Sequence, residues 1–375
     1  MTAHALLSAS GSKRWLSCTP SARLEATLPE QKKGAGSFDF SQEGTMAHSM
    51  AEAKLRYHFG QIETEEYENE ITTIKATPYY NDDFEANVDN YVLYVRSQIG
   101  EGDTPLFEQR VDFSDWVPDG FGTADVVILS KHSIRVIDLK FGKGIPVSAQ
   151  DNTQLRLYAL GAWSKFKDEF PEIKEVSYTI HQPRLDSIST DGTTISKLVD
   201  WANYFVKPKA KKAWSGAGEF LPGEWCQFCR AKAQCRARSD FNTEIARLEF
   251  KAPGLLSEEE VSEVLAKAQG LKTWASDVEE YALTRAVDQG VVPPGYKLAT
   301  TTTHRKISDS ALAATVLVEK GMNPEIIWEP AKLKSLASLE KINKQVAAWL
   351  GELVLRPEGQ PKLVKTKEDA KEDFA

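Results

Sequence analysis

The stretch GTADVVILSKHSIRVIDLK, residues 122–140, contains two runs rich in β-branched residues that are separated by a short polar segment. Two such runs joined in this way are typical of a β-hairpin. Alternate side chains of a strand point to the same face, so Asp138 and Lys140 are expected to share a face while Leu139 faces a core. A short hairpin also brings Asp125, near the start of the first strand, beside Asp138.

Periodic segments on both sides extend this hairpin into an α/β fold. Helical spacing of apolar residues predicts helices over residues 45–59, 81–98, 148–167 and 194–206. Further strands are expected over residues 106–113 and 175–181, the second of which ends before Pro183. The coarse order of helix, three strands, helix, strand and helix indicates a mixed sheet flanked by helices.

The sequence predicts a boundary after this α/β region, at residues 251–254. Ser257 and Glu260 form a capping box, which opens a long amphipathic helix that ends near residue 289. Residues 305–352 are expected to be mostly helical. We predict three parts: a first domain, a mostly helical C-terminal domain and a disordered tail, over residues 1–245, 246–356 and 357–375.

Size and charge limit the class of protein. The chain has 375 residues, 41% of them hydrophobic, which suffices for a full core and two domains. The sequence has neither an apolar run near the roughly 20 residues of a membrane-spanning helix nor a secretory signal, so we expect a cytoplasmic protein. The net charge of −8 argues against nonspecific coating of nucleic acid, although carboxylates that bind divalent metals also add negative charge.

The four cysteines are unevenly spaced: Cys18 lies far upstream of a triplet formed by Cys226, Cys229 and Cys235. Thiols stay reduced in the cytoplasm, so this set favours a metal centre over disulfides. Four thiolates hold either tetrahedral Zn²⁺ or a [4Fe–4S] cluster, and the number of cysteines does not distinguish them. Joining Cys18 to the triplet through such a centre would close a loop of about 210 residues and constrain the unfolded chain.

The hairpin offers the groups that metal-dependent phosphodiester cleavage uses. Hard divalent cations take carboxylate and other oxygen ligands, and a nearby cationic side chain stabilises the charged transition state. Asp125 and Asp138 are candidates for the ligands, and Lys140 is the candidate cation. Glu108, on the preceding predicted strand, is an optional acidic neighbour.

Two predicted helices add polar pairs at helical spacing. Gln154 and Tyr158 lie four residues apart, as do His48 and Glu52, so each pair shares a helix face. A lone histidine on a helix is by default structural, and Glu52 could equally be a surface carboxylate. His48 becomes a candidate through its place in the series of motifs.

The ordered series GTMAHSMAE (44–52), GTAD (122–125), DLK (138–140) and Gln154-x3-Tyr158 resembles the RecB-type branch of the PD-(D/E)xK nuclease superfamily. One cysteine before these motifs and three after them resemble its iron–sulfur subgroup. That subgroup includes the CRISPR-associated iron–sulfur exonucleases and the nuclease of the AddAB helicase–nuclease. Residues 6–22 also resemble a phage and prophage nuclease-like family. The resemblance covers about residues 1–240.

The resemblance implies a mixed-sheet nuclease core that binds Mg²⁺ or Mn²⁺. Lys140 would orient or activate the attacking water, and Gln154 and Tyr158 would support the site or contact DNA. The implied metal ligands are His48, Asp125, Asp138 and the Leu139 carbonyl. A [4Fe–4S] cluster, with Zn²⁺ as the alternative, would be a structural staple held by Cys18, Cys226, Cys229 and Cys235.

The function implied is that of a metal-dependent deoxyribonuclease, expected to be an exonuclease acting on single- or double-stranded DNA. Phage replication or recombination proteins are the expected partners, and the bacterial host cytoplasm the expected location if a phage encodes the chain. Two alternatives stay open. One is a catalytically silent nuclease fold that binds DNA or protein. The other, an iron–sulfur redox protein, leaves the series of His, Asp and Lys residues unexplained.

Overall fold

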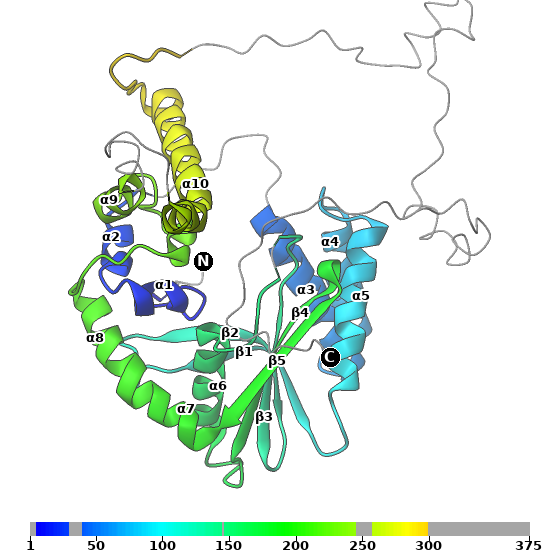
Figure 1. The fold of residues 1–375 in the computed structure, drawn as a ribbon. Helices are drawn as coiled ribbons and strands as arrows, with labels where there is room; N and C mark the ends of the chain where they lie inside the picture. The colour runs from blue at the N-terminus through cyan, green and yellow to red at the C-terminus, as the bar shows by residue number, and fades with distance from the viewer. Residues whose placement is uncertain (1–4, 30–39, 145, 245–256, 299–375) are drawn as a thin grey trace, which may run out of the picture. The chain divides into compact units, whose positions relative to one another are not determined.

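The computed structural model describes residues 5–29, 40–144, 146–244 and 257–298 (Figure 1). The chain divides into two compact units, Met1–Tyr281 and Ala282–Ala375, and all the strands lie in the first. The helices predicted over residues 305–352 and the predicted tail lie outside the described residues. In the described part of the chain, no helix has both the length and the apolar character needed to cross a membrane.

A mixed five-stranded sheet forms the centre of the first unit (Figure 1). Its strands, in spatial order, are β1 (Thr104–Asp112), β2 (Phe121–Leu129), β3 (Ser133–Leu139), β4 (Glu175–Gln182) and β5 (Ser187–Thr194). Neighbours are antiparallel except β3 and β4, which are parallel. A parallel pair needs a crossover, and α6 (Thr153–Phe166) supplies it. The predicted α/β class with a mixed sheet is confirmed.

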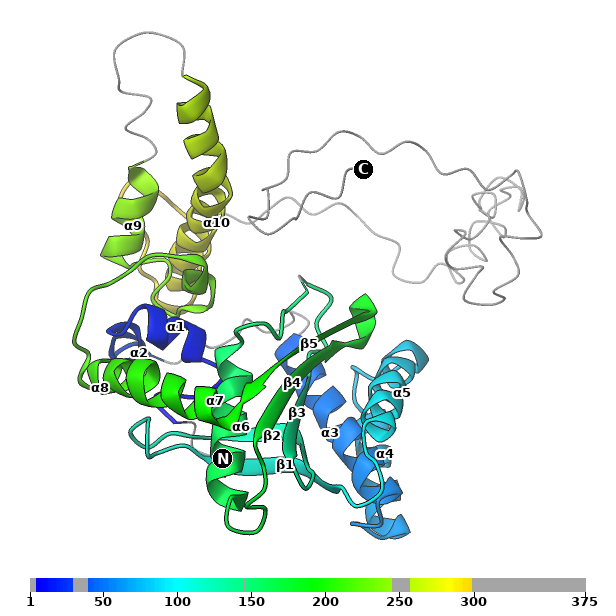
Figure 2. The same ribbon diagram turned by 60° about the horizontal axis from the view of Figure 1, so that its bottom comes forward.

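Helices cover both faces of this sheet (Figure 2). One face carries α3 (Phe40–His58), α4 (Thr64–Lys75) and α5 (Asp82–Ser97). The other carries α6, with α1 (Ser12–Ser17), α2 (Ser21–Ala26), α7 (Ile195–Trp201) and α8 (Lys207–Ser215) beyond it. Successive side chains of β2 point to opposite faces of the sheet, so Val127 packs in the core on the α6 side and Ile128 in the core on the α3 side.

The predicted hairpin is present as β2 and β3. Its register pairs Val126 with Ile137 and Leu129 with Ile134, and the Ser130 amide donates to the Ser133 carbonyl at 2.9 Å. Strand β4 ends at Gln182, directly before Pro183, as expected from the missing amide hydrogen of proline.

The sequence analysis missed helix α4 and strand β5. Strand β5 reads SISTDGTT and lies at the sheet edge with every second residue exposed, so no apolar run marks it. Helix α4 is acidic and buries only Ile71 and Ile74, which is too few apolar residues to reveal its period. The short helices α1 and α2 form part of a segment for which no regular helix was predicted.

The helix expected over residues 194–206 continues further than predicted. Thr194 caps α7, a π-helical turn follows over Ala202–Val206, and α8 ends at Gly216, whose φ is +73°. Three of the remaining described elements are short: the 3₁₀ turns over Pro183–Leu185 (η1) and Glu224–Phe228 (η3), and helix α9 (Arg236–Thr243). The fourth is the long helix α10 (Glu258–Gln289).

The predicted capping box at the start of α10 is present. The Glu260 amide donates to Ser257 Oγ at 3.3 Å, and the Ser257 amide donates to a Glu260 carboxylate oxygen at 3.0 Å. The helix ends at Gln289, before Gly290 with φ +68°. The domain boundaries predicted at residues 245 and 356 stay predictions.

A cluster of charges ties α3 to α4 and α5. Lys54 Nζ lies 2.8 Å from Glu85 Oε1 and 2.5 Å from Asp89, while Lys75 and the Tyr80 hydroxyl donate to the second oxygen of Glu85. Burial by itself raises the pKa of Glu85, but hydrogen bonds from Lys54, Tyr80 and Lys75 outweigh it and lower that pKa to about 2.

Replacing Glu85 by Gln is expected to lower the free energy of unfolding by about 1 kcal/mol near neutral pH, because the folded state loses a carboxylate that three donors stabilise. A carboxyl whose pKa is lower in the folded state stabilises the fold above its unfolded pKa. The difference between wild type and Glu85→Gln should therefore shrink as the pH falls from about 4.5 to about 2. Urea unfolding at several pH values measures it. Glu68→Gln, an exposed change on α4, is the control and should show no such difference.

Candidate active site and cysteine pocket

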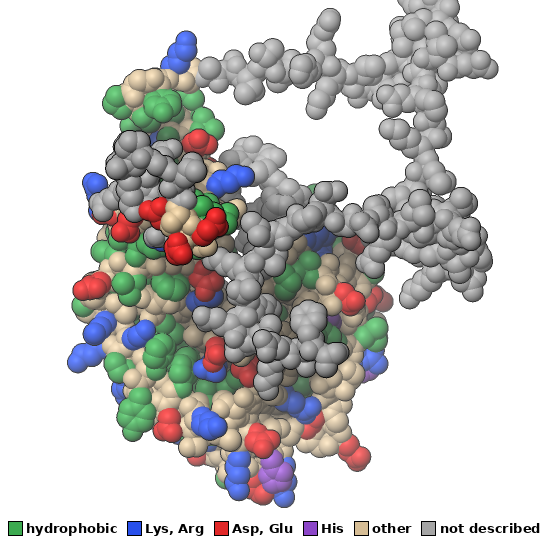
Figure 3. Space-filling model, in the orientation of Figure 1, with side chains coloured by type: hydrophobic (Ala, Val, Ile, Leu, Met, Phe, Trp, Pro, Cys, Tyr) green, Lys and Arg blue, Asp and Glu red, His purple; other side chains and the backbone are tan. Residues whose placement is uncertain are grey.

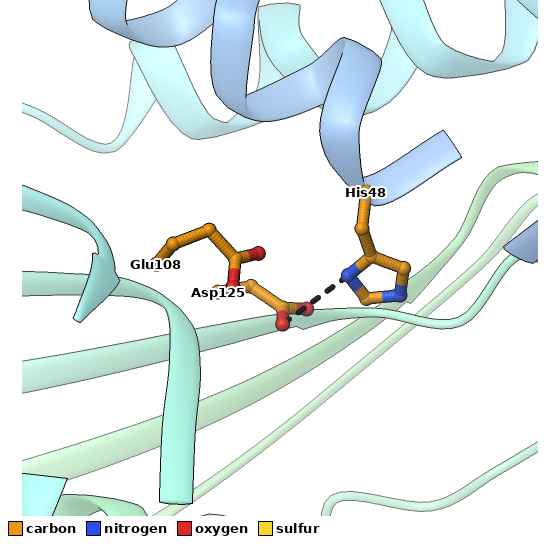
Figure 4. A group of neighbouring side chains, drawn as sticks. All are labelled: His48, Glu108 and Asp125. Carbon is orange, nitrogen blue, oxygen red and sulfur yellow. Dashed lines mark ion pairs between the residues drawn. The ribbon is translucent and has the colours of Figure 1, made fainter. Parts of the chain in front are cut away.

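Three side chains from three elements converge beside the sheet (Figure 4). His48 lies on α3, Glu108 on β1 and Asp125 on β2. One ligand atom of each lies within 4.8 Å of the other two, and His48 Nδ1 is 3.2 Å from Asp125 Oδ1. The structure therefore places the predicted pair His48 and Asp125 in contact and adds Glu108, which the sequence offered only as an optional neighbour.

Glu108 reaches this position through an unusual backbone conformation. Its φ is +44°, in the left-handed region that costs a non-glycine residue on the order of 1–3 kcal/mol. On either side of it the register is regular, with Phe107 opposite Val126 and Gln109 opposite Ala124, so Glu108 faces Asp125 across the strands. Such strain is retained mainly where function requires it.

Asp125 is held by the hairpin itself. Its second oxygen, Oδ2, accepts a hydrogen bond from the Leu139 amide at 2.7 Å. The carboxylate therefore joins β2 to the end of β3 with one oxygen and faces His48 with the other. The structure shows this role for the Leu139 amide; the predicted role of its carbonyl as a metal ligand stays a prediction.

Asp138 and Lys140 lie side by side at the end of β3, as their spacing predicted. The Asp138 side chain is only 2% exposed, and its Oδ2 is 2.8 Å from Lys140 Nζ. The Lys140 ammonium therefore compensates the charge of this buried carboxylate.

Gln154 connects this pair to α6. Its amide nitrogen donates to Asp138 Oδ1 and to the Tyr158 hydroxyl, each at 3.2 Å, and its carbonyl oxygen accepts from Lys140 Nζ at 3.3 Å. The structure thus joins four of the five residues predicted as catalytic by direct contacts, and Asp125 adjoins them through the amide of Leu139. Whether they act in catalysis stays a prediction.

Local sequence explains why α6 presents these side chains. Asn152 is the N-cap, and its side-chain oxygen accepts from the Gln154 and Leu155 amides, so α6 starts with Gln154 in its first turn. Gly122 leaves room for the Tyr158 ring, because a Cβ there would lie 2.7 Å from Tyr158 Cε1. The glycine of the GTAD motif is therefore explained by packing.

Each charged group of the site shifts the pKa of its neighbours. Burial favours a neutral His48, but Asp125, with smaller contributions from Asp138 and Glu108, raises its pKa to about 9. Burial and the Asp125 charge raise the pKa of Glu108 to about 7. Burial disfavours the Lys140 ammonium, yet Asp138 and Asp125 raise its pKa above the usual value. The site therefore gathers positive charge around its carboxylates.

The donor set fits a hard divalent cation. One imidazole and two carboxylates converge, and the charge of Asp138 interacts with those of Asp125 and His48. Glu52 lies outside the group of three and instead faces Arg56, with 3.8 Å between its oxygen and the guanidinium nitrogen. This position agrees with the sequence-based alternative that Glu52 is a helix-surface carboxylate.

The four cysteines line one pocket in a different part of the first unit. Cys18 follows α1, Cys226 lies in η3, and Cys229 and Cys235 follow η3 and precede α9. In a tetrahedral zinc site with Zn–S bonds of about 2.3 Å, the sulfurs would lie about 3.8 Å apart. Among the described residues, the His48 group is the one whose three potential ligand atoms all lie within 4.8 Å of one another, and the cysteines are not part of it.

Backbone amides point at three of the four sulfurs. The Gly223 amide donates to Cys226 Sγ at 3.4 Å, and backbone amides of Leu221 and Ala231 donate to Cys18 and Cys229. Burial raises the pKa of Cys18 and Cys226, and that of Cys229 to about 12. N–H donors and a dry surrounding are the features that tune sulfur-ligated centres.

Charged side chains tie the N-terminal segment to the cysteine loop. Arg14 donates to the Phe228 carbonyl at 3.0 Å and pairs with Glu25 at 2.7 Å, and Glu25 in turn accepts from the Arg230 amide at 2.7 Å. Two basic side chains, Lys232 and Arg238, line the pocket and both pair with Asp277. The two chain segments that carry the cysteines thus meet, as the sequence predicted.

Solved structures similar to this chain include two whose similarity extends over more than half of it. A candidate exonuclease from Eubacterium rectale aligns with a TM-score of 0.35 and 12% identity, over 60% of this chain and 86% of the other. SSO0001 aligns with a TM-score of 0.23 and 14% identity, over 58% of this chain and 95% of the other. A family model matches residues 4–372, and the chain therefore belongs to the family described as "Protein of unknown function (DUF2800)".

Proposed function

We propose that this protein is a divalent-metal-dependent DNA nuclease with a PD-(D/E)xK core, acting as an exonuclease. The observation that carries the proposal is the convergence of His48, Asp125, Asp138 and Lys140 from α3, β2 and β3, with Glu108 beside them. Action at DNA ends follows from the resemblance of the sequence motifs. The same resemblance suggests phage replication or recombination proteins as partners.

His48, Glu108 and Asp125 would hold Mg²⁺ or Mn²⁺, with Asp138 as a further ligand. When bound, such an ion stabilises charge on the phosphate and lowers the pKa of a coordinated water. The contact between Asp125 and the Leu139 amide fixes the carboxylate in advance, so little reorganisation is required.

Lys140 would act through its charge. Its neighbours raise the pKa of the ammonium, so it serves as a donor to the attacking water or to the phosphate and not as a base. Gln154 keeps the ammonium and the Asp138 carboxylate in fixed positions, because it contacts both at 3.2–3.3 Å. Gln154 is thus a positioning residue.

Lys140→Met is expected to lower the rate of DNA hydrolysis by roughly 10²–10³-fold, since it removes a cation placed to stabilise the transition state. The assay uses end-labelled linear DNA, single- and double-stranded, with Mg²⁺ or Mn²⁺. Lys143→Met, an exposed lysine three residues further along, is the matched control and should retain full activity. Circular DNA of the same sequence tests the requirement for ends.

Cleavage that survives Lys140→Met would contradict the proposal. DNA binding without cleavage by the wild type would instead favour a silent nuclease fold.

Gln154→Leu is expected to lower kcat by about tenfold, as is typical when a residue that orients a metal ligand or its neighbour is lost. The size of the side chain is kept, so the thermal unfolding midpoint should change little. Gln150→Leu, on the exposed loop before α6, is the control. A variant with unchanged kcat would show that the contacts of Gln154 with Asp138 and Lys140 have no catalytic importance.

We further propose that Cys18, Cys226, Cys229 and Cys235 hold a [4Fe–4S] cluster with a structural role. The arrangement of one cysteine upstream and three downstream, which resembles the iron–sulfur subgroup, and the backbone amides directed at the sulfurs support the cluster. The cluster would add a covalent link to the contacts that already join the N-terminal segment to residues 226–235.

Purified wild-type protein is expected to contain about four iron atoms per chain, and Cys18→Ser should lose most of the iron together with its visible absorption. The thermal unfolding midpoint should fall, because the long loop is no longer closed. Lys140→Met is the control and should keep its iron. Zinc in place of iron in the wild type would support the alternative, and a Cys18→Ser protein of normal stability would exclude the structural role.

A further inference from the structure

A buried ion pair joins the start of α3 to η1, the turn that follows β4. Arg184 reaches Glu43 with both guanidinium nitrogens: Nη2 lies 2.6 Å from Oε1 and Nη1 lies 2.9 Å from Oε2. Each side chain is 7% exposed. This two-point geometry fixes orientation as well as distance, because both the fork of the arginine and the carboxylate are planar.

Phe141 completes the arrangement. The guanidinium carbon of Arg184 lies 4.1 Å from the centre of the Phe141 ring, so the cation is held between a carboxylate and an aromatic face. Burying two charges costs several kcal/mol of desolvation per ion, which their attraction offsets when the geometry is good. Replacing a buried ion pair by apolar side chains of similar volume is often neutral or stabilising, so this pair needs an explanation besides stability.

The position of the pair supplies that explanation. Glu43 precedes His48 by five residues in the same helix, and Phe141 directly follows Lys140. The strand that leads into η1 is also tied to the site, since the Lys140 amide donates to the His181 carbonyl at 3.0 Å. The ion pair thus links α3, the helix that carries His48, to the ends of strands β3 and β4, where Lys140 lies.

We infer that Glu43 and Arg184 are positioning residues that hold α3 at the distance and rotation at which His48 meets Asp125. This inference rests on the proposed function, because it concerns the cation site of that function. It goes further by assigning the placement of the metal-binding helix to one ion pair outside the site.

The same helix offers a matched comparison. Lys54 is also a buried charged residue of α3, 12% exposed, and it pairs with Glu85 and Asp89 on α5. It stabilises the other end of the helix, and neither of these two partners belongs to the candidate site. Loss of either anchor destabilises α3, but only loss of the Glu43 anchor should alter the placement of His48.

Glu43→Gln is expected to bind Mn²⁺ about tenfold more weakly than the wild type, the effect typical of lost support around a ligand. Full-length protein is titrated with Mn²⁺ without DNA, and free Mn²⁺ is read by its electron paramagnetic resonance signal. The kcat for DNA hydrolysis should fall in parallel while KM for DNA stays unchanged. Arg184→Lys keeps the charge but loses the fork, and its Mn²⁺ affinity should also fall.

Lys54→Gln is the control: its thermal unfolding midpoint should fall, yet its Mn²⁺ affinity should match that of the wild type. Asp125→Asn identifies the measured site by abolishing Mn²⁺ binding. The inference fails if Glu43→Gln binds Mn²⁺ as the wild type does, or if Lys54→Gln loses as much affinity. Should Glu43→Gln not fold, Arg184→Lys with unchanged affinity overturns it. A wild type without Asp125-dependent Mn²⁺ binding overturns the proposed metal site as well, so the two failures are distinguishable.

Discussion

The carboxylate of Asp125 is the contact on which the candidate site depends. One oxygen accepts from the Leu139 amide and the other faces His48, so a single side chain fixes β2, β3 and α3 relative to one another. A shift of the hairpin by one residue would turn Asp125 to the opposite face and remove both contacts. The apolar alternation of the hairpin, which sets its register, is thus also what assembles the polar site.

Assembling these polar groups beside the sheet costs folding free energy. Asp138 is a buried carboxylate, Glu108 occupies a strained backbone conformation, and Glu43 and Arg184 bring two charges out of water. Each feature carries a local cost in free energy, and all of them lie at or beside one group of residues. Local costs that cluster in this way are characteristic of a site kept for its chemistry, with the cost met by the two cores on either side of the sheet. On the face seen in Figure 3, acidic and basic side chains are interspersed over the described surface.

Sequence reasoning succeeded where side-chain periodicity determines position. The β-branched runs of 122–140 fixed the hairpin, and the four-residue spacing of Gln154 and Tyr158 placed both on one face of α6. It failed where position depends on backbone conformation or on distant contacts. Nothing in the pattern of β1 indicates that Glu108 turns to φ +44°, and Arg184 stands alone in the sequence, 141 residues from Glu43. Polar strand β5 was missed because an edge strand needs no apolar run.

Both candidate centres draw one isolated member from the N-terminal part of the chain and the others from later segments. Cys18 follows α1, which packs with α8 and η3, whereas His48 lies on α3, which covers the opposite face of the sheet. The first 58 residues must therefore be anchored separately on both faces. Arg14 and Glu25 anchor the first part to the cysteine loop, and Glu43 anchors the second to η1. Because these anchors share no residues, a cluster at the cysteines would secure α1 and α2 but could not by itself place His48, which explains why α3 needs an ion pair of its own.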